Sequence, residues 1–113
     1  MLITTASTLD RLVTLTAPGA AVAPVVAALG EVEVQVRDAL PALEAMRGGV
    51  GLVDQLARIR NSAGMLRDSL SELQSVDGMT TFDPAFAADD ASWDAWFTKS
   101  AQLVRDAAKL VAG

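Results

Sequence analysis

LVDQLARIRNSAGMLRDSLSEL, residues 52–73, is the stretch that decides the fold. Its apolar residues recur at alternating steps of four and three, and they are Leu52, Leu56, Ile59, Ala63, Leu66, Leu70 and Leu73. Because an α-helix turns once in about 3.6 residues, this spacing places all of them on one narrow face. Polar residues occupy the other faces. The stretch therefore predicts a helix that packs against at least one other helix.

Residues 22–47 repeat the same alternation and supply a partner helix. Its apolar positions are Val25, Leu29, Val32, Val36, Ala39, Leu43 and Met46. Two features oppose a helix here: residues 31–37 also alternate with a period of two, as a half-buried strand does, and Pro41 removes a backbone hydrogen bond. We favour a helix because the helical spacing continues on both sides of 31–37. The glycines after Arg47 indicate a turn, so 22–47 and 51–75 are predicted to form a long helical hairpin.

The two ends of the chain add shorter elements. Residues 1–7 are rich in β-branched side chains and lack a helix cap, so we expect an extended arm. A short helix over 8–16 follows, and the Pro18-Gly19 pair ends it. Residues 91–111 carry another apolar face and are predicted to form the C-terminal helix. The expected fold is one all-α domain, a three- to four-helix bundle built on the hairpin.

Basic residues lie beside the apolar face of the third predicted helix. The overall acidity of the chain, and the lack of aromatic residues among Arg58, Arg60 and Arg67, disfavour a nucleic-acid site. Their position instead predicts ion pairs with a neighbouring helix, for Arg60 and Arg67 with an acid such as Glu33. Gly64, in the same helix, either lets a neighbouring backbone approach closely or marks a bend.

Residues 77–97 differ in composition from the rest of the chain. They contain every aromatic residue, and these are Phe82, Phe86, Trp93, Trp96 and Phe97. They also contain aspartates, Asp89 and Asp90 among them, and no Lys or Arg. We expect 77–90 to be an acidic aromatic loop that leads into the C-terminal helix. The rings either fill the open end of the bundle or anchor a partner protein, and both alternatives stay open.

The composition argues against several kinds of chemistry. The chain has no Cys and no His, which removes disulfides, thiol chemistry, imidazole catalysis and the usual zinc sites. The aspartates lack the spacing of a calcium loop, and no nucleophile or second base accompanies them. We therefore expect no catalytic residues, no metal site and no cofactor, and no small-molecule substrate is evident. The net charge of −5 and the pI near 4.4 oppose binding to nucleic acid.

The expected location follows from two further absences. The N-terminal residues lack the basic start of a secretory signal peptide, so we do not expect secretion by that route. The longest uncharged apolar run, 17–30, contains prolines and is shorter than the ~20 residues that cross a bilayer, so no membrane span is expected. The predicted location is a virion or the cytoplasm.

The apolar content is high for a small chain, with 51% hydrophobic residues and a mean hydropathy of +0.34. We therefore predict a non-enzymatic structural or interaction subunit of a larger oligomeric assembly, preferably a phage or virion particle, whose partners are other protein subunits. The alternative is a soluble helical adaptor or chaperone that docks a partner through residues 77–97. The candidate interface residues are Leu2, Ile3, Phe82, Phe86, Asp89, Asp90, Trp93, Trp96 and Phe97. Whether the apolar faces pack within one chain or between chains is left open.

Overall fold

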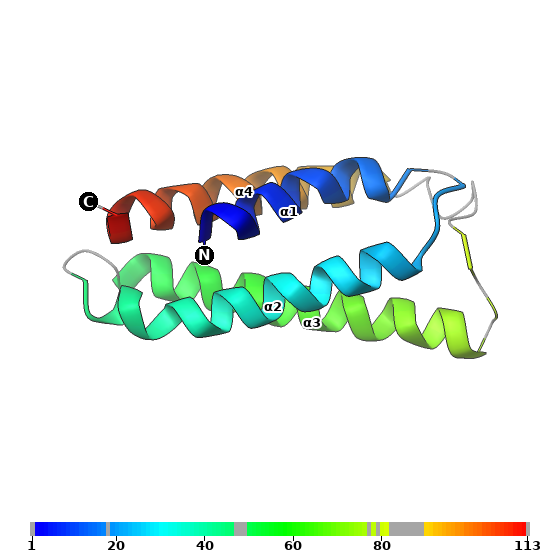
Figure 1. Ribbon diagram of the computed structural model, residues 1–113, viewed down its shortest axis with the longest axis horizontal. Coiled ribbons are helices and arrows are strands. Elements are labelled where there is room, and N and C mark those ends of the chain that lie inside the picture. The colour runs from blue at the N-terminus through cyan, green and yellow to red at the C-terminus, as the bar shows by residue number, and fades with distance from the viewer. Residues whose placement is uncertain are drawn as a thin grey trace.

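The computed structural model describes residues 2–17, 19–46, 50–76, 78, 80–81 and 90–112. Its elements are the helices α1 (Leu2–Leu15), α2 (Ala23–Glu44), α3 (Val50–Val76) and α4 (Asp90–Ala112). The described residues form no strand. The helices run alternately up and down in a bundle with extents of 46 × 22 × 18 Å (Figure 1). The predicted all-α class, the bundle and the long hairpin of α2 and α3 are confirmed.

The bundle consists of two antiparallel helix pairs. α2 packs along α3, and α1 packs along α4, so that one pair lies over the other (Figure 1). α1 also packs on α2, whereas α4 makes few contacts with either α2 or α3. The two pairs are therefore joined more closely on the α1–α2 side than on the α3–α4 side.

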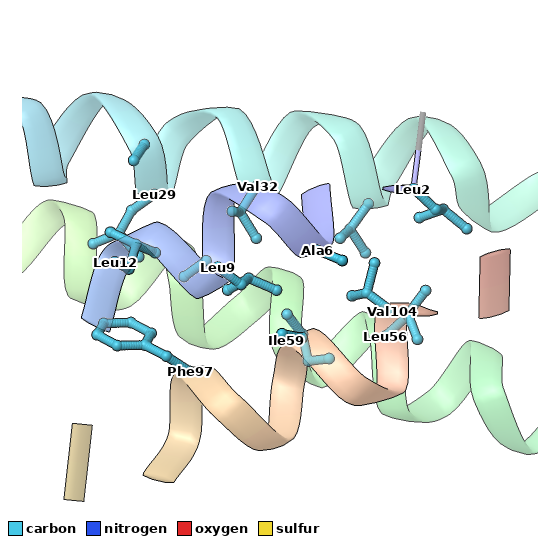
Figure 2. Packing of buried hydrophobic residues seen from close by; sticks show 14 of the residues in the cluster. Leu2, Ala6, Leu9, Leu12, Leu29, Val32, Leu56, Ile59, Phe97 and Val104 are labelled. Atoms are coloured by element: carbon cyan, nitrogen blue, oxygen red, sulfur yellow. The ribbon is translucent and has the colours of Figure 1, made fainter. Parts of the chain in front are cut away.

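The predicted apolar faces form the core. On α3 the buried residues are Leu56, Ile59, Ala63 and Leu70. On α2 they include Val25, Leu29, Val32, Val36 and Leu43. Figure 2 shows Leu56 and Ile59 of α3 grouped with Leu9 of α1 and Val104 of α4. In this structure the apolar faces thus pack against one another within one chain.

Residues 31–37 are helical, as favoured from the spacing, and α2 continues through Pro41 to Glu44. The period of two in this stretch has a simple origin. Val32 and Val36 are buried in the core, while Val34 is exposed on the outer face. Pro41 lacks the N–H that would bond to the carbonyl four residues earlier, but its own carbonyl accepts the N–H of Ala45 at 3.2 Å, and α2 ends within one turn, at Glu44.

The extended arm predicted over residues 1–7 is wrong, because α1 is one helix from Leu2 onward. Helix propensity is weak enough for tertiary contacts to override it. Leu2 and Thr5 are buried against the other helices, and Thr5 Oγ1 donates a hydrogen bond to Gln35 Oε1 of α2 at 2.6 Å. The short helix predicted over 8–16 is therefore only the second half of α1.

The chain that leaves α3 is held against the turn between α1 and α2. Both segments use a glycine with a left-handed backbone, Gly19 at a φ of 82° and Gly78 at 65°. The carbonyl of Thr80 accepts the N–H of Val22 at 2.9 Å, and Ala21 and Thr81 form an isolated β-bridge. These contacts fix the end of the bundle that lies opposite the chain termini (Figure 1).

Candidate interaction grooves

The structure separates the predicted interface residues into groups. Phe82, Phe86 and Asp89 lie outside the described residues, and Asp90 is the first residue of α4. Trp93, Trp96 and Phe97 lie in the first two turns of α4, while Leu2 and Ile3 begin α1. Two of these residues belong to the core, because Phe97 has an exposed fraction of 0% and Leu2 is also buried. Trp93, Trp96 and Ile3 reach the surface, and each lines an apolar groove.

The first groove lies between α3 and α4 and is called here the tryptophan groove. It has a volume of about 300 Å³ and is lined by Ser62, Met65, Leu66, Trp93, Trp96 and Phe97. Phe97 is packed edge-on against both indoles, with ring centroids 6.2 Å from Trp93 and 5.5 Å from Trp96. Such edge-to-face contacts hold the two indoles in place. Phe97 therefore fills the core, and the two half-buried indoles line the open groove.

The sizes of the side chains explain why a groove forms on this side of the bundle. α1 and α4 meet through small buried residues such as Ala6, Ser100 and Ala101, which allow their backbones to come close. α3 and α4 instead face each other with larger residues, Leu66 and Trp96 among them, and large side chains keep helix axes apart. Met65 lies at the groove with 71% of its surface exposed.

The second groove lies where α1 begins and is called here the isoleucine groove. It has a volume of about 460 Å³ and is lined by Leu2, Ile3, Gln35, Asp38, Ala39, Ala42, Ala108 and Val111. Ile3 is 67% exposed and Val111 is 41% exposed. A further hollow of about 320 Å³, the basic hollow, is lined by Ile3, Ala6, Ser7, Arg105, Ala108 and Lys109. Ile3 and Ala108 line both spaces, so the two adjoin each other at these residues.

Ion pairs join the helices within each antiparallel pair. Arg67 Nη1 of α3 donates to Glu33 Oε2 of α2, as predicted. Arg60 does not join them; it donates to Asn61 Oδ1 of its own helix at 3.3 Å. A Cβ at Gly64 would lie 3.1 Å from Glu33 Oε1, so this glycine makes room for a carboxylate and not for a neighbouring backbone.

A second ion pair joins α1 to α4. Arg105 Nη1 donates to Asp10 Oδ2 at 2.8 Å, and both side chains are partly exposed. Among the described residues, each helix pair thus has an ion pair across it, and Thr5 and Gln35 form a polar contact from α1 to α2.

Met65 is not among the predicted interface residues. It lies outside the four-three apolar face of α3, where the neighbouring residues are polar. An apolar side chain on a polar helix face is the signal that would have found it.

The grooves are mainly apolar, and the charged residues that line the two hollows around Ile3 are Asp38, Arg105 and Lys109. Within the part of the chain that the structure describes, no group of three or more Asp, Glu, His or Cys side chains is placed to hold a metal ion. None of the described helices is long and apolar enough to cross a membrane. Comparisons of the chain with protein-family models, with curated proteins and with solved structures find no match.

Proposed function

We propose that this chain is a non-enzymatic structural or interaction subunit of a larger oligomeric assembly, which it joins by helix packing. One observation carries the proposal. Trp93, Trp96 and Ile3 line apolar grooves on the surface of a bundle whose core is already filled by its own helices. Apolar surface of this kind is stabilised when a partner protein covers it.

The distribution of exposed apolar side chains supports the same proposal. Among the described residues, the large exposed ones are Ile3, Val34, Met65, Val76 and Val111. Ile3, Met65 and Val111 line the two grooves and do not lie scattered over the surface. Single exposed apolar residues are common on proteins, whereas a group of them around a hollow is typical of a contact surface.

The experiment is the molar mass of the purified chain in solution, measured by light scattering over a dilution series. A mass that is a stable multiple of 11.8 kDa supports the assembly subunit. A monomer at every concentration would overturn self-assembly. The phage or virion setting stays a prediction, and mass spectrometry of purified particles for this chain is the measurement that checks it.

The tryptophan groove favours a second candidate, the helical adaptor or chaperone. Trp is the side chain most enriched among residues that dominate binding energy, and here two indoles flank one hollow. A monomer whose Trp emission shifts when a partner protein is added, and whose binding is lost in Trp96→Ala, supports the adaptor. A variant at the other end of the bundle, Ile3→Ala, is the matched control and should bind that partner normally.

A further inference from the structure

We infer that the surface around Ile3 is a two-fold interface through which two copies of this chain associate. The inference rests on the proposed function and deepens it, because it names the partner as a second copy and identifies the residues in contact. The observations that carry it are the shape of this surface and the arrangement of charge across it.

The centre of the surface is apolar and contains both a projection and a hollow. Ile3, at 67% exposed, projects beside the isoleucine groove, whose volume is about 460 Å³. Val111, Ala39 and Ala42 line the same groove. A two-fold interface places one patch against itself, so the patch must supply the projection and the hollow together. This one does.

The charged residues that line the two hollows differ in sign between the two sides of Ile3. On the α2 side, the isoleucine groove is lined by the carboxylate residue Asp38. On the α4 side, the basic hollow is lined by Arg105 and Lys109. Asp38 forms an ion pair with its exposed neighbour Arg37 at 3.3 Å, and such a surface pair contributes little. Arg105 is engaged with Asp10, and Lys109 is exposed.

A two-fold axis that passes close to Ile3 and runs parallel to the helices brings each side opposite the other side of the second copy. Asp38 of one copy then faces Lys109 of the second copy, and the reverse contact forms by symmetry. Ile3 of each copy enters the isoleucine groove of the other. Opposite charges meet at both edges, so the patch is complementary to itself in charge as well as in shape. An unrelated protein would require no such arrangement.

The first test is sedimentation velocity of the full chain and of two aspartate variants over a dilution series. The wild type should sediment as a dimer of the 11.8 kDa chain. Ile3→Asp should raise the dissociation constant on the order of tenfold or more, because it places a carboxylate at the centre of the apolar contact. Val76→Asp is the control, since Val76 is 72% exposed but lines none of the three hollows. Equal helicity by circular dichroism shows that both variants fold.

The second test uses charge exchange. Asp38→Lys and Lys109→Asp should each weaken the dimer, because each variant places like charges opposite one another. When these two variants are mixed, opposite charges face each other again at both edges. The mixture should therefore form a heterodimer whose dissociation constant is lower than that of either variant's homodimer.

The outcomes distinguish this inference from the proposed function. A multimer that is unaffected by Ile3→Asp, or weakened equally by Val76→Asp, overturns the two-fold interface and leaves an assembly subunit standing. Two charge variants that fail to restore association on mixing also overturn it. A wild-type chain that stays monomeric at every concentration overturns both.

Discussion

Two helical glycines, Gly30 of α2 and Gly64 of α3, lie against the same ion pair between Glu33 and Arg67. A Cβ at Gly30 would meet Arg67 Cδ at 3.6 Å, which is an ordinary contact. A Cβ at Gly64 would lie 3.1 Å from Glu33 Oε1 and 3.3 Å from its Cδ. Gly64 thus has a steric reason to lack a side chain, and Gly30 has none.

Gly30→Ala should therefore raise the free energy of unfolding by about 0.5–1 kcal/mol, because alanine favours the helix and restricts the unfolded chain. Gly64→Ala should raise the free energy of unfolding by less, since the Glu33 carboxylate must move to make room for the methyl group. Urea denaturation followed by far-UV circular dichroism measures both values. Equal gains for the two variants would contradict the steric difference between the sites.

Phe97 is the largest fully buried side chain among the described residues, and it is in ring contact with Trp93 and Trp96. Phe97→Ala should lower the free energy of unfolding by about 3–5 kcal/mol, through lost burial and the cavity left behind. Val76→Ala, at an exposed position, should change it by less than about 0.5 kcal/mol. The comparison is made by urea denaturation. A loss below about 1 kcal/mol for Phe97→Ala would mean that the ring is not a core residue.

At the scale of the elements, the sequence predicts the helices well where an apolar face is long and regular. The four-three spacing of α2 and α3 continues over many turns, so it outweighs both Pro41 and the strand-like alternation of 31–37. The prediction fails over residues 1–7, because the helical pattern there is only one or two turns long. The helix in that segment is stabilised by burial of Leu2 and by the hydrogen bond from Thr5 to Gln35. Both are contacts with distant parts of the chain, so the local sequence does not reveal them.

The grooves are harder to predict than the helices. Trp93, Trp96 and Ile3 are predicted as interface residues from their type and place in the sequence, and all three line grooves. The sequence does not separate them from Phe97 and Leu2, which belong to the core. Whether such a residue lines a groove or lies in the core depends on the distance between neighbouring helices. The sequence of one helix does not determine that distance. Phe82, Phe86 and Asp89 lie outside the described residues, and their predicted role stays a prediction.

The ion pairs between helices lead to a further prediction. Glu33 and Arg67 have about 30% of their side-chain surface exposed, whereas Asp10 and Arg105 are more exposed. Because solvent screens exposed charges, a double-mutant cycle with alanine should give Glu33–Arg67 a coupling of about 0.5–1 kcal/mol and Asp10–Arg105 a smaller one. Added salt should reduce both couplings. A larger coupling free energy for Asp10–Arg105 would show that burial does not decide which of the two ion pairs is stronger.

At the scale of the whole molecule, the two grooves lie far apart along α4. Phe97 and Ala108 are separated by eleven residues, which is roughly 16 Å along the helix axis. An interface centred on Ile3 can therefore leave the tryptophan groove open. A subunit with two separate contact surfaces can form a pair through one surface and join a larger structure through the other.

This separation makes Trp fluorescence a test of which surface is in use. The chain has two Trp residues, and both line the tryptophan groove. If copies associate through Ile3, dilution below the dissociation constant should halve the mass while Trp emission and acrylamide quenching stay constant. Ile3→Asp, monomeric at the same concentration, should have the same emission and serves as the control. An emission that shifts to longer wavelength as the mass falls would instead place the contact between copies in the tryptophan groove, and the surface around Ile3 would then be exposed in the dimer.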